Sequence, residues 1–252
     1  MSNFVKDTSI VREIWGKSDT ILLVFAGASA EFALNKAVDW LYFTGKLPKD
    51  PLGRLFSTVQ YAKMIVFSEK STALKAIDQI AAIHHTVEKK RGQHIPDWAY
   101  KDVLFMLIDY SIRSYELLQR SLSVIEKQEV LDVFGHVGQR MGLKNLPLTY
   151  SEFEKLRYKH LEEDLENGKL SKDLYKQYRK HLGFFRYYLL LEAQILLVPN
   201  KVRALLNLRR LSLLKPFMVV YKVFRSLRMD WLLKELLLPP AYKEDIKRMN
   251  IT

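Results

Sequence analysis

The sequence predicts an all-α protein, a globular bundle of roughly ten helices. Hydrophobic residues make up 48% of the 252 residues, which is enough for a sizeable core. They recur at helical spacing, and no segment shows the period-two alternation of β-branched residues that is typical of strands. The 10 glycines and 8 prolines are few, and most of them stand where helices should end.

Start and stop signals give the order of the expected helices. A helix over residues 7–15 is followed by one long apolar helix, which Ser18 or Asp19 begins and which ends near Thr44. Asp50-Pro51 then combines a capping carboxylate with a proline at the first helical position. Further helices are expected over 68–91, 97–121, 123–142, 150–167 and 171–198, followed by short ones broken by Pro216 and Pro239-Pro240.

The composition excludes several classes of site. The chain has no cysteine, so disulfides, cysteine-ligated zinc, iron–sulfur clusters and covalently attached haem are excluded. No histidine follows a glutamate by three residues, so the Glu-x-x-His signature of helical di-iron proteins is absent. The first residues are not typical of a signal peptide and no apolar run is long enough to span a bilayer, which predicts a cytoplasmic protein.

One expected helix carries a histidine on its apolar face. The face consists of Ala73, Ile77, Ile80, His84 and Val87. The next residue, His85, is rotated about 100° away, toward the wetter flank of the helix. A neutral imidazole in the position of His84 suits a haem iron or another metal inside a bundle. A core histidine that is hydrogen-bonded to a backbone carbonyl would give the same pattern.

The preceding helix carries Arg54 and Thr58, which are four residues apart and share a face. The neighbouring apolar stripe consists of Leu55, Val59, Ala62 and Val66. Because that stripe must point into the core, Arg54 and Thr58 are expected at the core boundary, where an arginine needs an anionic partner. A haem propionate would serve, and so would a carboxylate from another helix, such as Glu31 or Asp39.

Four short motifs follow one another along the chain. They are Arg54-x-x-x-Thr58 after the Asp50-Pro51 turn, Ile83-His84-x-x-Val87, Gly142-Leu143, and Leu146-Pro147-x-Thr149. Their order and spacing resemble the catalytic-domain family shared by rubber oxygenases (latex clearing proteins) and MpaB, the ER-bound fungal oxygenase of mycophenolic acid biosynthesis. The resemblance spans residues 9–156, with a weaker late match at 236–239.

This resemblance implies an all-helical fold around a buried cofactor cavity that holds a non-covalent b-type haem. It implies that His84 is the proximal axial ligand of the haem iron, with Arg54 and Thr58 as cofactor-binding and catalytic residues. It also implies a catalytic domain over residues 1–198, with residues 199–252 packed on it or belonging to the same domain. The sequence departs from rubber oxygenases at Ser57, where they have lysine, and at Leu104, where they have a second histidine.

The C-terminal part is basic and rich in leucine. From residue 199 onward there are twelve Lys or Arg and four Asp or Glu, which accounts for most of the net charge of +12. The segment 201–228 interleaves these cations with apolar residues, a pattern typical of a helix at an anionic membrane surface. Packing of these helices on the domain, with solvated cations, would give the same pattern. The aromatic cluster around Arg186 is expected to be ordinary core and rim.

The resemblance implies a haem-b-dependent oxygenase that acts with O₂ on a hydrophobic, lipid- or isoprenoid-like substrate. A non-catalytic peripheral membrane or scaffold protein is the alternative, and it would bind anionic liposomes without containing iron. A nucleic-acid-binding protein is a third interpretation, for which affinity would fall steeply with salt.

Overall fold

The computed structural model describes residues 2–45 and 49–226, and it is all-α over this part of the chain. The described helices are α1 (Ile10–Trp15), α2 (Ser18–Leu34), α3 (Asp39–Thr44), α5 (Pro51–Phe67), α6 (Lys70–Arg91), α7 (Asp97–Leu118), α8 (Val124–Arg140), α9 (Tyr150–Glu163), α10 (Lys169–Leu197), α11 (Asn200–Leu205) and α12 (Lys215–Ser226). The predicted fold class is confirmed. The expected break at Pro239-Pro240 and the late motif at 236–239 lie outside the described residues.

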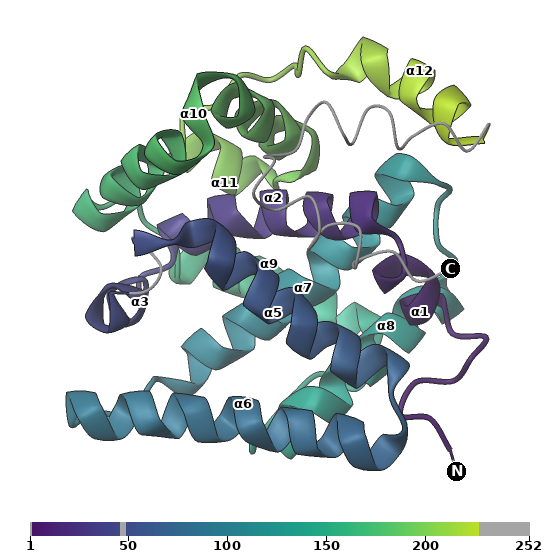
Figure 1. Ribbon diagram of the computed structural model, residues 1–252, viewed down its shortest axis with the longest axis vertical. Coiled ribbons are helices and arrows are strands. Elements are labelled where there is room, and N and C mark those ends of the chain that lie inside the picture. The colour runs from purple at the N-terminus through teal and green to yellow at the C-terminus, as the bar shows by residue number, and fades with distance from the viewer. Residues whose placement is uncertain (1, 46–48, 227–252) are drawn as a thin grey trace.

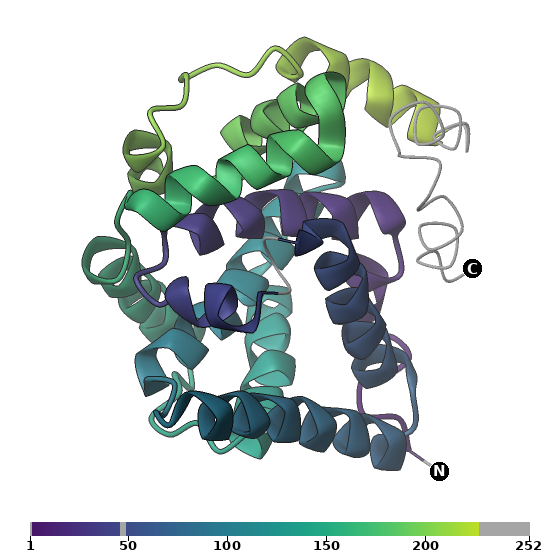
Figure 2. The same ribbon diagram turned by 60° about the vertical axis from the view of Figure 1, so that its left-hand side comes forward.

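Helix α2 is the central element. It packs against α7 on one side and against α10 on the other, while α5 packs against α6. Figures 1 and 2 show α6 on the opposite side of the molecule from α10 and α12, with α5 running between the levels of α2 and α6. The main core lies among α1, α2, α7, α8 and α9 and includes Trp15, Phe105 and Phe153. Val202 of α11 also belongs to it, whereas the predicted domain division at residue 199 stays a prediction.

Local capping chemistry sets several helix ends. Asp50 accepts a hydrogen bond from the backbone N–H of Gly53 ahead of Pro51, and Gly92 ends α6 in the left-handed conformation. Ser123 and Thr149 each form a reciprocal capping box with the glutamate three residues later. These ends agree with the sequence because each of them depends on residues that are adjacent in the chain.

The expected single helix from Ser18 to Thr44 is wrong. Helix α2 ends at Leu34, and the side chain of Asn35 accepts a hydrogen bond of 2.8 Å from the backbone N–H of Ala37 while donating one to Asp102. The backbone carbonyl of Leu34 accepts a hydrogen bond of 2.8 Å from the N–H of Glu166. Tertiary contacts therefore end this helix, and no glycine or proline marks the place.

Candidate functional site

A large apolar cavity occupies the space enclosed by α2, α5, α6, α7, α8, α10 and α12. Its volume is about 1950 Å³, and its walls are mainly aliphatic and aromatic side chains. Small-molecule pockets usually measure roughly 300–1,000 Å³, so this cavity is large for a single ligand. Arg54, Thr58 and His84 all line it, and the structure thus brings together the three residues that the sequence singled out.

His84 lies on the predicted face of α6. Ala73 and Ile77 of the same face are completely or almost completely buried, whereas His85 is exposed. The Nδ1 atom of His84 is buried and has no hydrogen-bond partner among the described residues. A core histidine bonded to a backbone carbonyl, the simpler interpretation of the sequence, is therefore not what the structure shows. A buried polar atom without a partner costs about 1–3 kcal/mol. A bound group that contacts Nδ1 of His84 would remove this cost.

The surroundings of His84 keep its imidazole neutral and oriented. Burial, with a smaller contribution from the charge of Arg54, lowers the pKa of His84 to about 4. The ring of Tyr100 meets the imidazole edge-on, with 5.3 Å between the ring centroids. The Tyr100 hydroxyl in turn donates a hydrogen bond of 3.4 Å to Glu88, which also accepts one of 2.9 Å from the backbone N–H of Ile95. Tyr100 thus contacts His84 from another helix, and no local pattern in the sequence indicates this contact.

Arg54 lines the same cavity without a carboxylate. No acidic side chain of a described residue pairs with its guanidinium. The two candidates from the sequence are engaged elsewhere, since Glu31 pairs with Arg157 and Asp39 pairs with Arg91. The side chain of Arg54 is exposed, yet burial lowers its pKa. Both observations are explained if the exposed surface of Arg54 faces the cavity and not bulk solvent. An anion inside the cavity would give this charge a partner.

The two hydroxyls near Arg54 bond within their own helix. Thr58 donates a hydrogen bond of 3.0 Å, and Ser57 one of 2.8 Å, to the backbone carbonyl of Arg54. Thr58 lines the cavity, and its oxygen can still accept a hydrogen bond there. Leu104 also lines the cavity and is almost fully buried against Gly138, where an added Cβ would lie 2.7 Å from its Cδ2.

One protein family matches this chain. Its description is ER-bound oxygenase mpaB/B′/rubber oxygenase, catalytic domain, and the match covers residues 15–240. The chain belongs to this family. No curated protein and no solved structure gives a significant match.

Membership of the oxygenase family agrees with the contents of the cavity. A haem needs only one protein ligand and anchors for its carboxylates. His84 offers a neutral imidazole, and Arg54 offers a cation that has no carboxylate partner among the described residues. Both residues line the same apolar cavity. Among the described residues, no group of three or more acidic, histidine or cysteine side chains could hold a metal ion by itself. The residues present therefore fit a haem better than a metal ion that only side chains coordinate.

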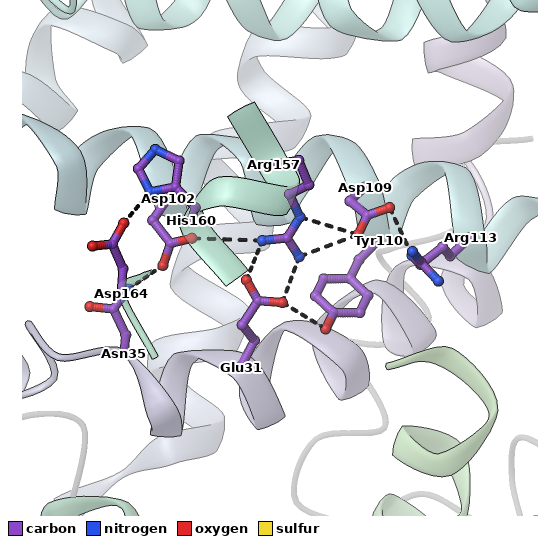
Figure 3. Close-up of polar contacts among 9 residues, drawn as sticks. All are labelled: Glu31, Asn35, Asp102, Asp109, Tyr110, Arg113, Arg157, His160 and Asp164. Carbon is purple, nitrogen blue, oxygen red and sulfur yellow. Dashed lines mark hydrogen bonds and ion pairs between the residues drawn. The ribbon is translucent and has the colours of Figure 1, made fainter. Parts of the chain in front are cut away.

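This oxygenase-family member also contains a buried charge network that the sequence did not predict (Figure 3). Arg157 of α9 pairs with both carboxylate oxygens of Glu31. Its Nε atom lies 3.2 Å from Asp109 Oδ2, and its Nη1 atom lies 3.6 Å from Asp102 Oδ1. Tyr110 donates a hydrogen bond of 2.9 Å to Glu31. The network joins α2, α7 and α9, and Glu31, Asp102 and Arg157 do not line the cavity. Burial, and then the charge of Glu31, raises the pKa of Asp102 to about 8.

A sequence signal for this network exists, although it cannot give the pairing. Glu31, Asp102 and Asp109 each interrupt an apolar stretch of a helix, and such residues need buried partners. Arg157 lies 126 residues from Glu31 and 48 from Asp109 in sequence. Nothing in the local pattern connects these positions.

Proposed function

We propose that this member of the oxygenase family binds a non-covalent b-type haem through His84 and uses O₂ to oxidise a hydrophobic, lipid- or isoprenoid-like substrate. The observation that carries the proposal is the neutral imidazole of His84, which has a buried nitrogen without a protein partner and lines an apolar cavity. Family membership supports the oxygenase activity, and the cavity contents support the choice of cofactor.

The residues of the chain would bind the haem and orient it. Haem, when bound, supplies the O₂ chemistry that no side chain of this protein can provide. With a pKa of about 4, His84 is neutral at physiological pH and can offer a nitrogen lone pair to a metal. The edge of Tyr100 restricts the rotation of the imidazole ring. Arg54 can donate charge-assisted hydrogen bonds to a carboxylate such as a propionate, and Thr58 can accept a hydrogen bond in the cavity.

The cavity supports a large apolar substrate. Its volume of about 1950 Å³ exceeds the usual range for one ligand, so a haem and a substrate can share it. Aliphatic and aromatic walls exclude water and align an apolar chain without hydrogen bonds. Ser57 bonds to its own helix and Leu104 is apolar, so neither side chain would help to hold a haem.

The decisive measurement is the haem content of the purified protein. Protein from cells supplied with a haem precursor is expected to show a Soret band, with near-stoichiometric haem b in a pyridine haemochrome assay. His84→Ala should lose this haem because it removes the proposed ligand. His85→Ala is the matched control, because it removes an exposed imidazole from the next position of the same helix.

Two results would contradict the proposal. A colourless wild-type protein after adequate haem supply would reject the cofactor. Equal haem in the wild type and in both variants would reject His84 as the ligand while leaving the haem itself in place.

A further inference from the structure

We propose that the surface formed by the second half of α10, the connection from α11 to α12, and α12 is a docking face for an anionic membrane, through which a lipophilic substrate reaches the cavity. We define this docking face as the exposed side chains within residues 184–222. The role as an entrance rests on the proposed function, whereas the membrane contact does not.

Exposed apolar side chains are concentrated on the docking face. It holds eight of the sixteen large apolar side chains that are exposed in the described part of the chain. They are Phe184, Phe185, Tyr188, Leu211, Leu213, Phe217, Val219 and Val220. Phe184, Leu213 and Phe217 are each more than 60% exposed. Leaving such a cluster in water is unfavourable, and clusters of this kind mark interaction surfaces.

The sign of the charge around this cluster selects the partner. Between residues 184 and 222 there are seven Lys or Arg and one acidic residue, Glu192. Glu192 is buried, and it accepts hydrogen bonds from Arg209, from the Ser212 hydroxyl at 3.0 Å and from the backbone N–H of Leu213 at 2.6 Å. The single negative charge is therefore used to hold the connection between α11 and α12 in place.

Three cations of the docking face are exposed and have no carboxylate partner among the described residues: Arg210, Lys215 and Lys222. Exposed cations beside aromatic and aliphatic side chains suit an interface of anionic headgroups above acyl chains. An acidic protein would match the charges but would not need the exposed phenylalanines. No described helix is both long and apolar enough to cross a membrane.

The docking face is continuous with the cavity. Phe185, Leu213, Phe217 and Val220 are at least half exposed, and all four line the cavity. Figure 1 shows α10 and α12 on the same outer side of the molecule, away from α6. The hydroxyl of Tyr221 on α12 donates a hydrogen bond of 2.8 Å to Asp19 at the start of α2, and both residues line the cavity, so this bond holds α12 at the cavity. A substrate dissolved in a bilayer could therefore enter without crossing water.

The test is co-sedimentation of the full chain with vesicles of phosphatidylcholine, with and without phosphatidylserine. The wild type is expected to bind only the vesicles that contain phosphatidylserine. Reversing three cations, R210E/K215E/K222E, should weaken binding by roughly 100-fold. Its matched control is K144E/K155E/K172E, which changes the net charge equally at exposed lysines outside the docking face and should bind almost as the wild type does.

A second pair of variants tests the apolar contribution. F184S/F217S should weaken binding by about 10- to 100-fold, while V124S/I125S removes two exposed apolar side chains from the start of α8 and should leave binding unchanged. The circular dichroism of every variant shows whether it is folded. His84→Ala should bind vesicles as the wild type does, so vesicle binding separates this inference from the haem assignment.

Three outcomes would overturn the docking face. The first is wild-type protein that does not respond to phosphatidylserine. The second is equal weakening by the variants and their matched controls. The third is a dimer in size-exclusion chromatography that dissociates in F184S/F217S while no vesicle binding is seen, because a second copy of the chain would then be the partner.

Discussion

Two regions of the molecule each contain an arginine and a histidine, and they differ in what those side chains contact. Arg157 lies among Glu31, Asp102 and Asp109, and His160 contacts Asp164 with 2.5 Å between Nδ1 and Oδ2. In the other region, Arg54 and His84 line a cavity and have no carboxylate in contact. In the first region the arginine and the histidine have acidic partners within the fold. The second lacks such partners, and this is the physical reason for the proposal that it binds a ligand.

The largest effect that distinguishes the two regions is on stability. Arg157→Met should lower the free energy of unfolding by about 3–5 kcal/mol, because it leaves buried carboxylates without a cation. Urea denaturation followed by circular dichroism measures this loss. The matched control is Arg140→Met, which breaks an exposed pair with Asp78 and should change stability far less.

An additional variant tests the reason for that loss. Adding Glu31→Gln to Arg157→Met should restore part of the stability, because it removes one of the uncompensated buried charges. Equal destabilisation by Arg157→Met and Arg140→Met would show that the buried network does not hold the helices together.

A second effect is the pH dependence of stability, and its change per pH unit is smaller than the loss expected for Arg157→Met. The pKa of Asp102 is raised in the fold from its ordinary value near 4 to about 8, so within that window the folded state binds more protons than the unfolded state. The free energy of unfolding should therefore fall as pH rises through the window, by at most about 1.4 kcal/mol per pH unit. Asp102→Asn should remove this contribution, as denaturation at several pH values would show. A slope identical to that of the wild type would mean that Asp102 is ionised in the fold.

The smallest expected effect on stability is at Arg54. Arg54→Gln should change the free energy of unfolding by less than about 0.5 kcal/mol, since no carboxylate loses a partner. The same variant should weaken haem binding by roughly 10- to 100-fold if Arg54 holds a propionate. Arg54→Lys keeps the charge and should retain more of the affinity. Destabilisation as large as that of Arg157→Met would show that the arginine serves the fold and not a ligand.

The two regions also differ in how far the sequence predicts them. His84, Arg54 and Thr58 were identified because each lies one or two helical turns from apolar neighbours on its own helix, and because short motifs surround them. Their meeting on one cavity could be expected from the family resemblance but not from the spacing. Tyr100, which contacts His84, lies on a different helix, α7. The sequence around His84 therefore does not indicate this contact.

The fold shows the same division between local and long-range information. The helix ends at Asp50, Gly92, Ser123 and Thr149 could be predicted because a cap depends on neighbouring residues. The end of α2 could not, because the contacts that Asn35 and the Leu34 carbonyl make come from α7 and from the segment after α9. The exposure of apolar side chains on α10 and α12 could not be predicted either. The sequence of an amphipathic helix is the same whether or not another element covers its apolar face.

Helix α10 bends at Gly183, where φ is 73° and ψ is 176°, a conformation that is essentially restricted to glycine. Leu174 and Tyr178 before the bend are buried in a core of their own, while Phe184 and Phe185 directly after it are exposed. An added Cβ at Gly183 would meet no atom within 4 Å, so the backbone alone sets the angle. Helix α10 therefore consists of two helical segments that meet at Gly183. Substitutions of the exposed residues directly after Gly183, Phe184 and Phe185, can therefore alter the docking face without touching the core in which Leu174 and Tyr178 are buried.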